Sequence, residues 1–302
     1  MFTEESNDYT FNASALGVGG YFTRNGRRVL VPSLASVALP PGGGEGWARE
    51  QNYDRDGIAF THAESRVVGY ETSPGIYTTY SDILVTNLSV LNRVRVAMLQ
   101  ATVTSTRDIG CPEPKFELHA VYRGVEIDGI EVIPRIDINV CQSSNYLSLA
   151  QNALPAIAAC DARSLALAQK RQLAISRGEP IRTSIISDIE ANHQDAQALL
   201  ANRHRNVLDV QGLGRIHFGE LLVKPGRRRV NLLRFEFGRR LDFGGMQVMQ
   251  EERVAETNIA DDSMPVMHTM KLSLTADSKT ADSGSLTVGS GDGNGAPVWP
   301  SA

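Results

Sequence analysis

The stretch KFELHAVYRGVEIDGIEV, residues 115–132, decides the fold class that the sequence predicts. Apolar and polar residues alternate through its first half, which is the period of two expected of a strand with one buried face. Asp128 and Gly129 then separate two alternating segments, and this dipeptide favours a two-residue hairpin because a type I′ turn needs positive φ at both positions. An antiparallel pair of strands is therefore expected here.

The same texture extends on both sides of this stretch. Residues 8–142 read as short strands separated by turn signals, and residues 93–106 are rich in Val and Thr, which suits a strand covered on both faces for part of its length. Further on, the turn signal KPGR separates two apolar runs, so residues 215–223 and 229–237 are expected to pair as a second hairpin. We predict a mainly β fold, with an antiparallel, β-sandwich-like body formed by residues 8–142 and 206–248.

Between the two parts of this body the composition changes. Residues 143–178 are rich in Ala and Leu, poor in β-branched residues, begin with two candidate N-cap serines and end at a glycine. After a Glu-Pro break, apolar residues recur every fourth position from Ile181, which predicts an amphipathic helix that ends near Arg203. The sequence therefore predicts an α-helical hairpin over residues 143–205, inserted into the β-rich chain.

The last segment, residues 249–302, is rich in Ser, Asp and Gly. Residues 266–274 alternate like a strand that could join a sheet edge in its own molecule or in a second copy, and its candidate contact residues are Met270, Leu272 and Leu274. The closing residues 289–302 are expected to form a flexible tail. Within them GDGNG resembles a calcium loop but lacks the later bidentate acid, so no metal site is predicted.

Charge is distributed unevenly along the chain, whose net charge is −4. Residues 203–240 hold ten Lys or Arg against three Asp or Glu, whereas residues 249–302 hold three against eight, so the two segments are expected to meet within one molecule or between copies. The candidate interaction residues of the basic segment are Arg227, Arg228, Arg229, Arg234, Arg239 and Arg240. Solvated, edge-protecting strand ends explain them first, a protein-partner surface second and nucleic acid third, because no aromatic residues are interleaved for base stacking.

No catalytic, cofactor or metal site is predicted. The six histidines form no HExxH motif and none lies near a cysteine at ligand spacing. There is no GxSxG, GxxxxGK[ST] or complete GxGxxG motif. Carboxylates such as Glu131 and Glu220 lie in expected strands, but their convergence does not follow from the sequence. Trp47 and Trp299, the two tryptophans, fall in Gly- or Pro-rich segments and are expected in loops.

Compartment signals are sparse. No apolar run approaches the roughly 20 residues that span a bilayer, so no membrane span is expected. The acidic first residues do not resemble a signal peptide, which leaves an intracellular protein, unconventional export or a removed leader, in which case the protein would lie at the extracellular surface. Three cysteines indicate neither a disulfide scaffold nor a zinc ribbon, and a Cys111–Cys141 bridge would require an oxidising compartment.

Three segments resemble, in order, the body of the bacterial choice-of-anchor P family: residues 80–106, 121–134 and 208–237. The resemblance covers about half of the chain. It implies a bacterial, surface-displayed, non-catalytic β domain of unknown ligand that carries a signal peptide and a C-terminal anchor. This sequence shows neither of those two features and adds the predicted helical hairpin, and no catalytic residue follows from the resemblance.

The leading hypothesis is a non-enzymatic structural protein that self-associates through its helical hairpin and C-terminal strand into an oligomer, filament or shell. The alternative is a carbohydrate- or polymer-binding surface module, or a weak hydrolase, that uses a strand face and the loop around Trp47. Its ligand would then be a cell-surface component or a polysaccharide. A nucleic-acid role through the arginines at 227–229 ranks third and would show a steep salt dependence.

Overall fold

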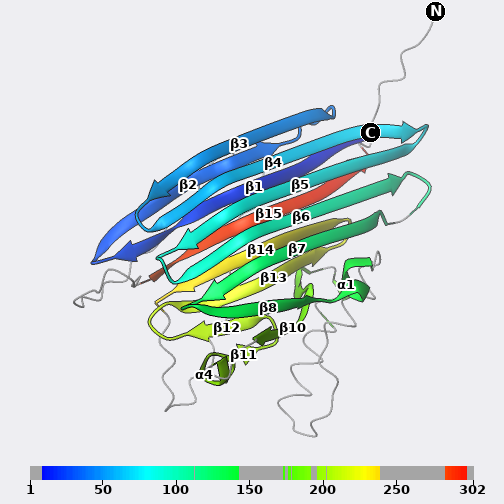
Figure 1. Cartoon of the computed structure of the whole chain (residues 1–302). Helices are drawn as coiled ribbons and strands as arrows, with labels where there is room; N and C mark the ends of the chain where they lie inside the picture. The colour runs from blue at the N-terminus through cyan, green and yellow to red at the C-terminus, as the bar shows by residue number, and fades with distance from the viewer. Residues whose placement is uncertain are drawn as a thin grey trace, which may run out of the picture.

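The strands of the computed structural model form two antiparallel sheets (Figure 1). The structure describes residues 9–111, 113–142, 173, 176–177, 179–191, 196–201, 203–238 and 283–297. Sheet A has the order β11-β12-β13-β14-β15-β1-β2, with β9 also paired to β13, and sheet B has the order β10-β8-β7-β6-β5-β4-β3. The strands of sheet A are β1 (Tyr9–Arg24), β2 (Arg27–Ala38), β9 (Ile181–Ser184), β11 (Arg203–His204), β12 (Val207–Val210), β13 (Gly214–Lys224), β14 (Arg227–Phe237) and β15 (Ser283–Pro297). Those of sheet B are β3 (Gly44–Arg55), β4 (Ile58–Ser73), β5 (Ile76–Val90), β6 (Val94–Asp108), β7 (Lys115–Ile127), β8 (Ile130–Ile136) and β10 (Ile186–Ala191).

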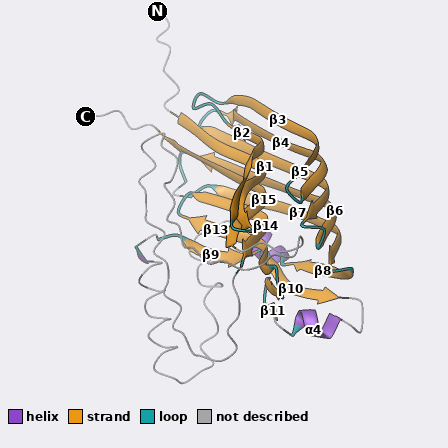
Figure 2. Ribbon diagram, turned by 90° about the vertical axis from the view of Figure 1, so that its left-hand side faces the viewer, coloured by secondary structure: helices purple, strands orange, loops and turns teal. Residues whose placement is uncertain are grey.

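The two sheets face each other across one hydrophobic core (Figure 2). Phe22, Phe218 and Phe235 of sheet A are almost fully buried, as are Ile83 and Leu99 of sheet B. Burying side chains of this size stabilises a fold by roughly 1.5–3 kcal/mol each relative to exposure. The prediction of a mainly β fold built from antiparallel strands is therefore confirmed.

Both predicted hairpins are present. β7 and β8 pair across a turn at Asp128 and Gly129, whose φ angles are 51° and 81°, as a type I′ turn requires. β13 and β14 pair from Lys224 opposite Arg227 onward. The dipeptide and the KPGR turn thus fix these two connections locally.

The predicted helical hairpin over residues 143–205 is not supported, and its second helix, from Ile181, is wrong. α1 (Ile138–Gln142) and α4 (Ala196–Leu200) are each five residues long, and residues 173 and 176 are also helical. Residues 181–184 and 186–191 are strands β9 and β10. Residues four apart share a face in a strand as well as in a helix, so the spacing of the isoleucines does not separate the two. Their β-branched side chains favour the strand, and Ile189 is buried in β10, as is Ile185 in the bend between β9 and β10. Most of residues 143–180 lie outside the described residues.

Strand β15 corrects the prediction of a flexible tail. It lies between β1 and β14 and pairs with both over most of its length (Figure 1). Glycine recurs at every second position from Gly289, which is the period of a strand with one smooth face. The alternating segment at 266–274, which holds the predicted contact residues, lies outside the described residues.

The glycines of β15 let the two sheets approach closely. A Cβ atom on Gly291 would lie 2.5 Å from Ile83 Cδ1, and one on Gly293 would lie 3.1 Å from Thr79 Oγ1. Ser81 Oγ of sheet B donates a hydrogen bond of 2.6 Å to the Asp292 backbone carbonyl of sheet A. The glycine repeat is therefore a packing feature, because any larger side chain would push the sheets apart.

A row of residues with positive φ crosses sheet B. Asn52, Asn87 and Gly124, on the alternate strands β3, β5 and β7, have φ between 52° and 56°. The pairing register places Thr61 of β4 and Ala97 of β6 between them. The Asn87 side chain donates a hydrogen bond of 3.0 Å to Thr61 Oγ1. Asn and Gly are the residues that adopt this conformation at least cost.

Sheet A has a matching row. Ala35, Gly289 and Gly219, on β2, β15 and β13, have φ of 48°, 64° and 57°. At each row the alternation of buried and outward side chains changes phase, so that Leu232 and Leu233 of β14 are both fully buried. A single period of two therefore cannot describe these strands from end to end.

Candidate functional site

The outward face of sheet A carries the arginines that the sequence singled out. Asp292 of β15 lies opposite Ser14 of β1 on one side and Arg229 of β14 on the other. Its carboxylate accepts hydrogen bonds from Ser14 N and Oγ, both at 2.8 Å, from Arg227 Nη2 at 2.5 Å and from Arg229 Nη2 at 3.0 Å. The Asp292 side chain is only 2% exposed. One buried carboxylate thus fastens three strands together.

These contacts settle how Asp292 is charged. Burial acts to raise the pKa of Asp292, but Arg227, Arg229 and the Ser14 hydrogen bond outweigh it, so its pKa is lowered. The carboxylate is therefore ionised at neutral pH. The basic segment, residues 203–240, therefore contacts the acidic segment, residues 249–302, within one molecule through Arg227, Arg229 and Asp292.

A second charged cluster continues along the same face. Arg234 binds Glu220 with two hydrogen bonds, at 2.8 and 2.7 Å, and also contacts Glu236. His217 Nε2 lies 3.4 Å from Glu236, and Arg182 Nη1 lies 3.4 Å from Glu220. Hydrogen bonds from His217 and Arg234 hold the pKa of Glu236 well below its usual range against the opposing effect of burial. The cluster thus links strands β9, β13 and β14 through contacts between oppositely charged side chains.

Arg228 points the other way, between the sheets. It is 3% exposed, its guanidinium carbon lies 4.6 Å from the Phe116 ring centroid, and Nη1 donates to the backbone carbonyls of Lys224 and Arg227. The prediction that arginines at this strand end are solvated is therefore wrong for Arg228. An interior position suits it because the guanidinium can stack on an aromatic ring while it bonds to carbonyls.

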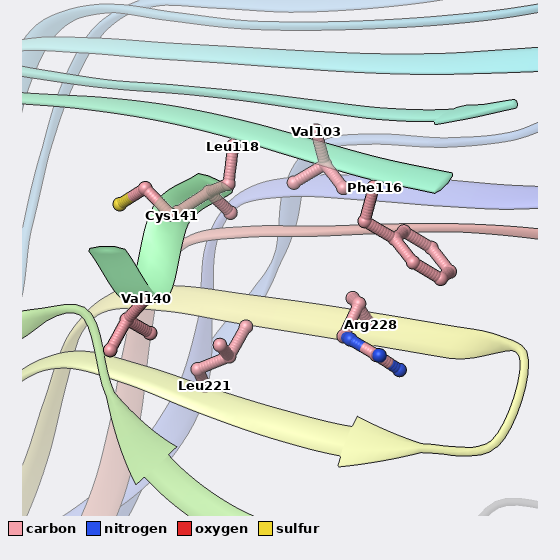
Figure 3. Close-up of a pocket in the computed structure, with 7 residues that line it drawn as sticks. All are labelled: Val103, Phe116, Leu118, Val140, Cys141, Leu221 and Arg228. Carbon is pink, nitrogen blue, oxygen red and sulfur yellow. The ribbon is translucent and has the colours of Figure 1, made fainter. Parts of the chain in front are cut away.

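Beside Arg228 lies a small cavity (Figure 3). Its volume is about 10 Å³, near the lower limit for one water molecule. Cys141 lines it, and burial, with a smaller effect of Asp137, raises the pKa of the Cys141 thiol to about 11. Cys141 and the exposed Cys111 are both free, so they do not form the bridge considered above. A neutral thiol in a cavity of this size is structural.

A larger pocket lies at the hairpin turns of sheet B. Its volume is about 330 Å³ and its lining includes Arg93, Asp128 and Glu126. Arg93 binds Asp128 with two hydrogen bonds, at 2.8 and 2.6 Å, and also donates to the Gln211 carbonyl at 2.8 Å. The Asp128 carboxylate in this pocket is thus engaged by Arg93 of the same molecule.

The described residues contain no cluster of three or more metal-binding side chains. Among the helices that the structure describes, none is long and apolar enough to cross a membrane. Of the predicted interaction residues, those that fall outside the described residues are Arg239, Arg240, Met270, Leu272 and Leu274. The other four, Arg227, Arg228, Arg229 and Arg234, make contacts within the molecule.

Among the aromatic residues that the structure describes, the most exposed lies on strand β3, at the edge of sheet B. Trp47 is 55% exposed, and the Arg49 guanidinium lies 5.1 Å from its ring centroid. Glu45 accepts a hydrogen bond of 2.7 Å from Arg66 of β4. The expectation that Trp47 belongs to a loop is wrong, because GEGWARE, residues 44–50, pairs with β4 throughout despite the glycines before Trp47.

Along its other side, β3 pairs with no strand of the described residues. β3 is twelve residues long, so it presents a row of unpaired backbone donors and acceptors. β2, the corresponding edge of sheet A, contains Pro32 and a register shift beside it, which are devices that block strand addition. β3 contains no proline. Sequence reasoning missed this edge because strand order is not encoded locally.

The fold and these surfaces define a mainly β, two-sheet domain whose buried charges link its own strands and whose strand β3 is an edge of sheet B. The chain belongs to the family described as Domain of unknown function (DUF8256), whose model matches residues 9–195. The resemblance to the choice-of-anchor P family is therefore corrected. The matched region holds all of sheet B together with β1, β2 and β9. Searches of the curated proteins and of the solved structures found no match.

Proposed function

We propose that this protein is a non-enzymatic structural domain that self-associates through the free edge of sheet B. The observation that carries this proposal is strand β3, an edge strand twelve residues long that lacks proline and lysine and exposes Trp47. Charged residues and the positive φ of Asn52 protect the end of β3, so Gly44–Gln51 is the stretch that is open to another strand. Main-chain hydrogen bonds would supply the affinity and side chains the specificity.

The route of association differs from the one that the sequence suggested. β15 occupies the middle of sheet A within its own molecule, so it is not available as an exchanged edge strand in this arrangement. The helical hairpin that was to form the other contact is not supported. Deleting residues 257–302 would remove β15 from the core and unfold sheet A, so that deletion cannot test assembly.

The test is the mass of the purified protein by light scattering over a wide range of concentration, for wild type and for Trp47→Lys. We expect the wild type to form larger species as the concentration rises and Trp47→Lys to remain monomeric. Tyr70→Lys is the matched control, because Tyr70 is 49% exposed on the neighbouring, internal strand β4. A wild-type monomer at every concentration refutes the proposal.

A second candidate, binding of a carbohydrate or another polymer, is favoured by one observation. Trp47 stands exposed on the outward face of sheet B, and Arg66 lies directly opposite it on β4. An aromatic ring beside hydrogen-bond donors suits a sugar surface. Polysaccharide binding that is lost in Trp47→Ala would support this candidate, and no binding across polysaccharide classes would remove it.

A further inference from the structure

Around Trp47, strand β3 carries opposite charges at equal distances along the chain. Glu45 lies two residues before Trp47 and Arg49 lies two residues after it, and small residues, Gly46 and Ala48, fill the positions between. The three larger side chains are exposed and share the outward face of the sheet. Reversing the direction of this segment exchanges its negative and positive ends, so the segment is complementary to itself.

We infer that two copies of the chain pair antiparallel through β3, with the two-fold axis at Trp47; this inference rests on the self-association proposed above. Residues that are directly opposite in an antiparallel pair are related by i ↔ 94 − i in this arrangement, which follows from placing Trp47 opposite itself. Glu45 then faces Arg49 of the second copy, and Arg49 faces its Glu45. Each interface of this kind is isologous, so one favourable pair occurs twice.

Neighbouring registers lose this complementarity. Moving the axis to Ala48 places Trp47 opposite Arg49 and Glu45 opposite Gln51, so neither pair of opposite charges remains. A parallel arrangement would place Glu45 beside Glu45 and Arg49 beside Arg49. Like charges that are directly opposite are destabilising, so charge selects both the direction and the register.

The contacts within one molecule leave room for this pairing. Glu45 and Arg66 remain about half exposed, at 54% and 49% of their side chains, although they bond to each other. Arg66 lies on the β4 side of Glu45, so Arg49 of a second copy would approach from the free side. Gly46 and Ala48 present no bulk on the inward face, where Gly46 already packs against Val37.

The association is expected to be weak. A strand pairing of this length buries less than the roughly 1,000 Å² that stable interfaces exceed. Each exposed cross-strand charge pair contributes roughly 0.2–1 kcal/mol. Because the interface holds two Glu45–Arg49 pairs, a substitution that turns both into like-charge pairs should lower the affinity measurably. One substitution does this, because the two-fold axis places it in the interface twice.

The test is a charge-reversal set measured by sedimentation equilibrium on the full chain. Glu45→Arg alone and Arg49→Glu alone should each weaken the homodimer at least about tenfold, because each places like charges opposite one another. The double variant E45R/R49E should recover most of the affinity. An equimolar mixture of the two single variants should form heterodimers, since both cross-pairs are then opposite in charge. Glu117→Arg is the control, because Glu117 is exposed on the internal strand β7 of the same sheet.

The outcomes separate the two proposals. If the wild type associates and the single reversals associate equally well, the inferred register is overturned while association through the edge of sheet B still stands. Failure of the double variant or of the mixture to recover affinity overturns the register as well. If the wild type is a monomer throughout, both proposals fall. Thermal melting of every variant shows whether a loss of association reflects unfolding instead.

Discussion

Replacing Asp292 by alanine is expected to destabilise the fold by about 3 kcal/mol. The substitution removes the acceptor of five hydrogen bonds, two from Ser14 and three from Arg227 and Arg229. The side chains of Arg227 and Arg229 are 26% and 41% exposed, so water can solvate both guanidinium groups in the variant. Loss of their ion pairs with Asp292 therefore costs little. The Ser14 backbone N–H faces its β15 partner and loses a charged acceptor, at roughly 1.5–3 kcal/mol per bond.

The assay is equilibrium unfolding in urea followed by circular dichroism, with the slope m compared between variants. Asp54→Ala on the exposed edge strand β3 is the matched control and should change stability by less than about 0.5 kcal/mol. If the last residues of the chain were a flexible tail, Asp292→Ala would behave like this control. A change for Asp292→Ala below about 0.5 kcal/mol would refute the role assigned to β15.

Three further predictions concern packing, acid stability and thiol reactivity. Gly291→Ala should lower stability by roughly 1–3 kcal/mol in thermal or urea unfolding, because the new Cβ meets the facing isoleucine, whereas Gly42→Ala, with nothing within 4 Å, should have little effect. The lowered pKa of Glu236 contributes stability above its unfolded pKa of about 4.3, and this stability is lost as the pH falls further. Unfolding midpoints measured from pH 7 to 3 should therefore drop less steeply for Glu236→Gln than for the wild type. At pH 8 a maleimide should label the exposed Cys111 rapidly and the buried Cys141, with its raised pKa of about 11, only slowly, as peptide mapping by mass spectrometry would show; equal rates would contradict the burial of Cys141.

The parts of the fold that the sequence predicts correctly are those with local signals. The Asp128-Gly129 turn and the KPGR turn specify their conformations within four residues, so both hairpins follow from adjacent sequence. The long strand at 93–106 is also recognisable, because Val and Thr dominate it and its neighbours are next to it in the chain.

The parts that the sequence does not predict depend on distant partners. The glycine repeat of β15 has the period of a strand, yet its meaning appears only when Ile83 and Thr79 are placed against it. Composition alone suggests a tail. Likewise, the isoleucines at 181–189 fit a helix or a strand until β8 and β13 are available for pairing.

The candidate site shows the same division. Sequence reasoning found the arginines of β14 and the acidic segment that they meet, because charge can be counted. It assigned Arg228 to solvent because it took no account of which face each arginine occupies. Along β14 the alternation of buried and outward side chains shifts by one residue, and the two consecutive buried leucines, Leu232 and Leu233, mark this shift in the sequence. The edge β3 left no local trace, since an edge is defined by the absence of a neighbour.

The position of β15 also determines the order in which the two sheets can form during synthesis. Asp292 of β15 accepts a hydrogen bond from Ser14 of β1, 278 positions earlier in the chain. β1 therefore cannot complete its pairing in sheet A until β15 has been synthesised. At ordinary rates of translation that wait is on the order of tens of seconds. Sheet B, whose seven strands all lie before residue 192, can form in the meantime. During that interval β1 is a second open edge on the nascent chain, and chaperones or neighbouring nascent copies have access to it before β15 arrives.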